Sequence, residues 1–231
     1  MAWVPRARRR LWTARDTLAY KRPMRLSRTS RSFAALVFFV ATVACAAEFN
    51  WNWRNQETIG RNDPSLGNTS RITDNDRAAL IAQIVARLQK PLRAQGYEDD
   101  RIREIASTTR VRFVDLGDGN TAILATSLGL EGGCDVLVNC PFWIFRQQRD
   151  KYVAILDTTG ASYTVQPTRT NGLSDLVIAR HDTPNESRLT VYSFNKLKYR
   201  EAGCYVATWT EAKAGNIGDP ELTACSAKGA H

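Results

Sequence analysis

Histidine is almost absent from this chain, and its scarcity limits the available chemistry. The 231 residues include two histidines, of which His231 is the last residue. Zinc sites use CxxC pairs or nearby histidines, and the sequence contains neither arrangement. A nucleophile activated by histidine would have to use His181. Because the GxSxG, HExxH and phosphate-binding GxxxxGKS/T motifs are also missing, we predict no metal, no cofactor and no enzyme class defined by a motif.

The sequence also lacks an apolar run long enough for a transmembrane helix. A span needs about 20 apolar residues, whereas the stretch from Phe33 to Ala47 has fifteen. A basic segment precedes this stretch, and the small residues Ala44 and Ala46 end it, which is the pattern of a secretory signal peptide. We therefore assign residues 1–46 to a signal peptide, read from Met1 or from Met24, and predict a periplasmic or secreted protein.

Two other fates of this leader remain open. The triple Arg8-Arg9-Arg10 is typical of a twin-arginine signal, although it lies more than twenty residues before the apolar run. Cys45 follows Thr42-Val43-Ala44, which matches a bacterial lipoprotein site except that Thr42 replaces the usual leucine. A lipid anchor at Cys45 is thus an alternative to a processed chain without a membrane anchor.

The leader carries all of the net positive charge. The formal charge is +9, and residues 1–46 hold ten Lys or Arg against one Asp, so the remaining 22 bases and 22 acids cancel. Nucleic-acid binding depends on a basic surface field. A neutral exported chain lacks that field, and we predict no nucleic-acid partner.

Four cysteines remain once Cys45 is removed, and an even number suits an oxidising compartment. They allow three pairings. We favour Cys134 with Cys140, which closes a tight loop, and Cys204 with Cys225, which ties the C-terminal tail to a strand. Each bond would stabilise the domain by about 2–4 kcal/mol.

The order of hydrophobic periodicities predicts an α+β fold. Residues 47–72 form an irregular N-terminal segment that wraps or trails, and residues 73–231 form a single domain. Thr73 or Asp74 caps a helix with one apolar stripe, and Pro91 kinks or ends it. A short second helix spans Arg101 to Ala106.

After Thr108, short runs of β-branched and aromatic residues alternate with turn residues. The short links favour a mainly antiparallel sheet on which the helices pack. The expected strands are Arg110–Leu116, Thr121–Ser127, Phe142–Arg146, Lys151–Asp157, Ser162–Gln166, Leu176–His181, Arg188–Phe194 and Lys198–Thr208.

Aromatic residues are the candidate binding residues. Phe49, Trp51 and Trp53 alternate with asparagines, so an extended segment would place all three rings on one side. Such a row can stack on sugar rings or dock on the protein core, and both interpretations remain open. The tryptophans considered for binding are Trp51, Trp53, Trp143 and Trp209.

A carboxylate pair is the catalytic arrangement that the composition leaves open. The separation of two such groups decides the mechanism of sugar hydrolysis. The candidates are Asp157, Asp175, Asp182 and Glu186, of which the last two belong to the chemically varied loop from His181 to Glu186. A hydrolase would use Asp175, His181 and Glu186.

Four short motifs follow one another between Arg110 and Trp209. They are CDVLVNCPFWI from Cys134, NGLSDLV from Asn171, the segment from Ala179 to Asp182, and an ending that contains Tyr192-Ser-Phe194, Lys198-Tyr199-Arg200 and Cys204-Tyr205. In this order they resemble a family of exported bacterial proteins of uncharacterised function, which has a glycine where this chain has Val138. The resemblance implies the same fold and export, and it implies no activity.

The sequence therefore predicts an exported α+β domain that binds a component of the cell envelope without catalysis. The expected partner is an envelope protein or a glycan that contacts the tryptophans. The alternative is a carboxylate-based hydrolase that acts on an envelope glycan or peptide.

Overall fold

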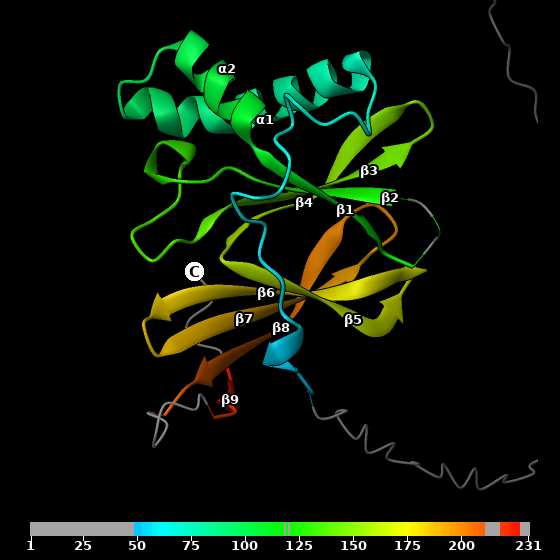
Figure 1. Cartoon of the computed structure of the whole chain (residues 1–231). Helices are drawn as coiled ribbons and strands as arrows, with labels where there is room; N and C mark the ends of the chain where they lie inside the picture. Colours follow the sequence, from blue (N-terminus) through cyan, green and yellow to red (C-terminus); the bar gives the residue numbers. More distant parts are fainter. Residues whose placement is uncertain (1–48, 118, 120, 211–217, 227–231) are drawn as a thin grey trace, which may run out of the picture. The chain divides into compact units, whose positions relative to one another are not determined.

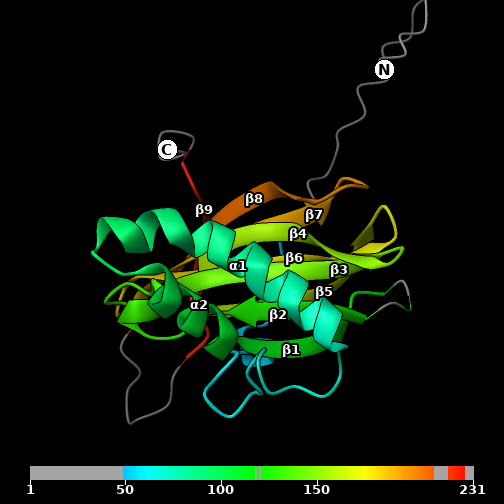
Figure 2. The same ribbon diagram turned by 90° about the horizontal axis from the view of Figure 1, so that it is seen from above.

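Two antiparallel sheets stack face to face in the computed structural model of the chain, and two helices cover the free face of the first sheet (Figures 1 and 2). The structure describes residues 49–117, 119, 121–210 and 218–226. The two helices precede the antiparallel strands along the chain, and this arrangement confirms the α+β class. The predicted signal peptide lies outside the described residues.

The two helices begin and end close to their predicted positions. Helix α1 spans Asp74–Ala94, and the Thr73 hydroxyl caps it by accepting the N–H of Asp76 at 3.1 Å. The helix continues past Pro91 to Ala94, so of the two predicted effects of Pro91, a kink or an end, the end was wrong. Leu92, the next residue, is fully buried and holds the last residues against the core. Helix α2 spans Asp99–Thr108.

The strands divide between two sheets, whereas the sequence predicted one. The first sheet has the order β1-β2-β3-β4 and the second the order β5-β6-β7-β8-β9. All eight expected strands are present, and the short β9 was not predicted. Their bounds are β1 Arg110–Asp115, β2 Thr121–Thr126, β3 Cys140–Gln148, β4 Lys151–Gly160, β5 Ser162–Thr170, β6 Leu173–Thr183, β7 Glu186–Phe194, β8 Tyr199–Thr208 and β9 Glu221–Ala224.

The first sheet is buried on both faces. In β3, Phe142 and Ile144 belong to the core between the sheets, while Trp143 and Phe145 belong to the core beneath the helices. Successive strand residues point to opposite faces, so a strand covered on both sides needs an unbroken apolar run. The run Phe142–Phe145 therefore reflects the position of β3 between two layers.

Both predicted disulfides are confirmed. Cys134 pairs with Cys140, and Cys204 pairs with Cys225. The second bond joins β8 to the residue that follows β9, beside the backbone hydrogen bond from Cys225 N–H to the Cys204 carbonyl at 2.9 Å. The C-terminal tail is thus fixed to the second sheet as expected.

Residues 49–72, here called the strap, run across one edge of both sheets (Figure 1). Glu57 bridges to Tyr163 on β5, and Ser65 bridges to Arg110 on β1. These two strands are the outer strands of their sheets, and an uncovered outer strand invites pairing with other chains. The irregular segment therefore wraps, as one of the two predicted alternatives required, and it covers both edges.

A charged network fastens the strap to the first sheet. The Arg112 side chain donates from Nε and a terminal nitrogen to the two carboxylate oxygens of Asp63, at 3.0 and 2.8 Å, and from its other nitrogen to Glu57 at 2.8 Å. The Tyr163 hydroxyl donates to the same Glu57 carboxylate at 2.9 Å. Hydrogen bonding to Asp63 raises the pKa of Arg112 further above its usual value, against the opposing effect of burial.

Replacing Arg112 by methionine should lower the free energy of unfolding by about 2–3 kcal/mol, mainly because the largely buried Asp63 carboxylate loses its partner, as does the exposed Glu57. Urea unfolding followed by circular dichroism measures this change. The matched control is Arg103→Met, which breaks the exposed pair with Asp100 and should change stability by less than about 0.5 kcal/mol. Equal losses in the two variants would contradict the role given to Arg112.

Candidate functional site

The four candidate tryptophans do not form one surface. Trp51, Trp53 and Trp209 pack together on the outer face of the second sheet, where the ring of Trp51 meets that of Trp209 edge-on at 6.1 Å. Trp143 lies beneath the helices on the far face of the first sheet and is 2% exposed. Two sheets therefore separate it from the other three.

Each of these tryptophans has a structural partner. Trp51 is 5% exposed and donates its indole N–H to the Thr164 hydroxyl at 3.2 Å. Trp53 donates to Asp219 at 2.8 Å, and Trp143 donates to Asp157 at 3.0 Å. Sugar stacking needs a free ring face. Trp51 and Trp143 are buried, whereas Trp53 and Trp209 are partly buried in the outer cluster, so stacking on all four rings has no geometric support. Docking of Phe49, Trp51 and Trp53 on one side of the strap agrees with the other interpretation.

The predicted catalytic residues are not brought together. Asp175 and His181 lie six residues apart on the single extended strand β6, a separation of about 20 Å. His181 stands opposite Ser187 in the register. Because neighbouring strand residues point to opposite faces, Glu186 does not share the face of Ser187 and His181.

The other candidate carboxylates bind arginines. Asp157 accepts Arg87 Nε at 2.9 Å, and Asp182 accepts Arg188 Nε at 3.0 Å. Asp175 is buried, and its Oδ1 has no hydrogen-bond partner. The set Asp175, His181 and Glu186 that a hydrolase would use is therefore not assembled around one point.

A cleft of about 720 Å³ opens elsewhere, where four separate segments meet. Its walls come from strap residues 58–61, from the loop that precedes β3, from the turn at residues 160–163 and from His181. Sites for small ligands typically enclose about 300–1,000 Å³ and have mostly apolar walls. The lining here includes Ile59, Phe142 and the Cys134–Cys140 disulfide.

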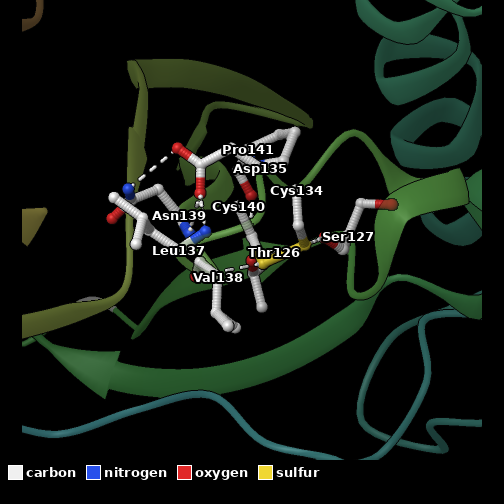
Figure 3. The surroundings of a disulfide bond; sticks show 9 residues. All are labelled: Thr126, Ser127, Cys134, Asp135, Leu137, Val138, Asn139, Cys140 and Pro141. Atoms are coloured by element: carbon white, nitrogen blue, oxygen red, sulfur yellow. Dashed lines mark hydrogen bonds between the residues drawn. A yellow bond between two sulfur atoms is a disulfide. The ribbon is translucent and has the colours of Figure 1, made fainter. Parts of the chain in front are cut away.

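The disulfide loop, residues 134–140, owes its shape to one carboxylate (Figure 3). Asp135 Oδ1 accepts the N–H groups of Leu137 at 3.0 Å and Asn139 at 2.9 Å, and its Oδ2 accepts the Asn139 side-chain amide at 2.9 Å. Partial desolvation tends to raise the pKa of Asp135, but these hydrogen bonds outweigh it and lower the pKa below its usual value.

Asn139 connects this loop to the second sheet. Its buried amide donates to the His181 carbonyl at 2.9 Å and accepts the His181 N–H at 2.8 Å. The side chain therefore satisfies both backbone groups of one β6 residue. Sequence reasoning missed Asp135 and Asn139, although both stand between a predicted pair of bonded cysteines.

Exposed apolar side chains gather at the rim of the cleft. Val136 is 88% exposed, Leu130 is 66% exposed and Val138 is 65% exposed, and all three line the cleft. They make up half of the six large apolar side chains that are exposed in the described part of the chain. Exposed apolar groups that cluster together mark binding surfaces more often than scattered ones do.

Val138 also occupies a strained backbone conformation. Its φ of 63° lies in the left-handed region, which a β-branched residue rarely adopts. Strain of this kind persists only where the surroundings impose it. Here the disulfide and the hydrogen bond from the Val138 N–H to the Asp135 carbonyl, at 3.0 Å, hold the residue in place.

A tight turn of the strap contributes Arg61 to the lining of the cleft. The Gly60 N–H donates to Asp63 Oδ2 at 2.8 Å, and the Asp63 N–H donates to the Gly60 carbonyl at 3.1 Å. Asp63 in turn binds Arg112. The network that fastens the strap therefore also fixes the turn that carries Arg61 into the cleft lining.

Searches of family models, curated proteins and solved structures found no match for this chain. Within the described ranges, no three His, Cys, Asp or Glu side chains are placed to hold a metal ion. None of the helices described is both long and apolar enough to cross a membrane.

Replacing Val138 by glycine should raise the free energy of unfolding by about 0.5–1 kcal/mol. Release of the strain of the left-handed backbone stabilises the folded state by about 1–2 kcal/mol. The greater conformational freedom of glycine in the unfolded chain offsets about 0.5–1 kcal/mol of this. The control Val136→Gly, in the same loop but without a positive φ, should lose about 0.5–1 kcal/mol. Chemical unfolding with the disulfides intact measures both, and a loss at Val138 would disprove the strain.

Tyr163 supplies a test at alkaline pH. Burial, as the main cause, raises the pKa of this phenol to about 12. Because the folded-state pKa lies above the unfolded value of about 10, the contribution to stability is complete below pH about 10 and is lost as pH rises toward 12.

Between pH about 9 and about 11, the wild type should therefore lose about 1 kcal/mol more stability than Tyr163→Phe does. Urea unfolding at the two pH values gives the comparison. Parallel losses in the two proteins would mean that the phenol titrates normally.

Proposed function

We propose that this chain is an exported binding module that holds an apolar ligand in the cleft beside its disulfide loop. The observation that carries the proposal is the convergence of Leu130, Val136 and Val138 on one mostly apolar cleft. Covering a valine or leucine side chain contributes about 1.5 kcal/mol or more. A ligand that covers these exposed side chains therefore gains hydrophobic binding free energy from each of them.

The rigidity of the cleft supports the same function. The disulfide, the Asp135 hydrogen bonds and the Asn139 amide hold one wall, and the Arg112 network holds the other. A site that is already formed spends little binding energy on ordering. Backbone strain at Val138 is understandable if the loop must present this side chain to a ligand.

Two disulfides suggest an oxidising, extracellular compartment, which supports export. Location in the periplasm or outside the cell belongs to the proposal. We favour binding over hydrolysis because Asp175 and His181 occupy distant positions of one strand. An apolar ligand replaces the glycan of the sequence prediction, because two of the four tryptophans are buried and the other two are partly buried against the second sheet.

Fluorescence titration with Nile red, an uncharged apolar fluorophore, tests the proposal. The wild type should bind the dye, and Ala161→Trp should weaken binding at least about tenfold because the indole fills the cleft that Ala161 lines. Ala82→Trp places the same side chain in a second groove, which lies between α1 and α2 and is lined by Ile81 and Arg103, and this variant should bind like the wild type. Absence of saturable binding by the wild type, or equal binding by all three proteins, would overturn the proposal.

A second pair of variants keeps the test independent of folding defects. Val138→Asp puts a charge on the rim, while Leu197→Asp changes an equally exposed apolar residue between β7 and β8. Only the first should weaken Nile red binding.

A further inference from the structure

Arg61 is the one lysine or arginine among the described residues that line the cleft. It is exposed at the tip of the turn from Gly60 to Asp63. A guanidinium can bind a carboxylate through two parallel hydrogen bonds. Its place on an otherwise mostly apolar wall gives the cleft one group that can select a ligand by charge.

The acidic residues closest to Arg61 along the strap are already occupied. Glu57 and Asp63 both bind Arg112 on β1. Arg61 makes no ion pair with any residue that the structure describes. The strap therefore pairs its own acids with the sheet and leaves a cation for the cleft.

The acid on the other wall is occupied too. Asp135 accepts three hydrogen bonds, from the backbone of Leu137 and from the backbone and side chain of Asn139. The positive charge of Arg180 also acts on it. Asp135 thus shapes the disulfide loop, and among the described lining residues Arg61 is the lysine or arginine without an ion pair.

We infer that the ligand is an amphipathic monocarboxylate, whose apolar body lies against Val136 and Val138 and whose carboxylate binds Arg61. The inference rests on the binding function proposed above. One guanidinium balances one negative charge, which suits a carboxylate better than a phosphate dianion. A fatty acid and the C-terminus of an apolar peptide share this chemistry.

Displacement of Nile red by ligands that share one apolar tail measures the contribution of the head group to binding. Decanoate, decanol and decyltrimethylammonium have the same apolar chain and differ in the charge of the head. Decanoate should displace the dye at a concentration about two- to fivefold lower than decanol, which is the range of an exposed ion pair. Decyltrimethylammonium should be the weakest of the three.

Arg61→Gln should abolish the preference for decanoate over decanol, with both ligands measured by their displacement of the Nile red that the variant itself binds. The control Arg149→Gln removes the same charge from an exposed residue in the turn between β3 and β4, outside the cleft, and should keep the preference.

A second experiment compares displacement of Nile red by a short apolar peptide that ends in a free carboxylate with displacement by its C-terminal amide. Stronger displacement by the free acid would assign the carboxylate to a peptide terminus, and displacement by decanoate alone would assign it to a small acid.

The two proposals fail in different ways. If Nile red does not bind the wild type, the binding function itself is wrong. If Nile red binds but decanoate and the peptide acid show no advantage over their uncharged counterparts, or if Arg61→Gln keeps that advantage, the carboxylate inference is wrong and the apolar cleft stands.

Discussion

The bonds from Arg112 to the strap are the interaction that fastens one covered edge of both sheets. Arg112 lies on an outer strand and binds Asp63 and Glu57, which flank the turn of the strap. Through Glu57, the network extends to Tyr163 on the outer strand of the second sheet. One guanidinium therefore links both sheets to the segment that covers them. It also fixes the position of Arg61, so the edge cover and a wall of the cleft depend on the same interaction.

The hydrophobic layers explain why the strap is needed. Helices cover one face of the first sheet, and the second sheet covers the other. This leaves the outer face of the second sheet, where Val177 and Leu189 would otherwise face solvent; Trp51 and its neighbours cover them. The strap places Trp51 in this outer cluster, Ile59 between the sheets and Leu66 beneath the helices. Aromatic residues that suggested a sugar-binding row thus complete the core of a layered domain.

Local sequence patterns predicted the helices and strands, and long-range contacts decided how these elements pair and pack. The helical stripe of α1 and the alternation within each strand depend on a few neighbouring residues, so periodicity reveals them. The division into two sheets depends on which strands pair across long stretches of chain, and no short pattern records it. The apolar run Phe142–Phe145 indicates burial on two sides without naming the layers. β9 is only four residues long and too short to show a period.

The sequence by itself determined the neutral charge of residues 47–231, and its cysteine spacing favoured the two disulfides that the structure confirms. The signal peptide stays a prediction. The sequence also determined the class of fold. Only the tertiary structure decided the site. The cleft joins residues 58–61, 134–140 and 160–163 with His181, which are far apart along the chain and meet through sheet stacking. The role of a carboxylate depends on which groups folding places beside it. Asp157 and Asp182 each lie beside an arginine and form an ion pair, whereas Asp135 lies beside Asn139 and stabilises the disulfide loop.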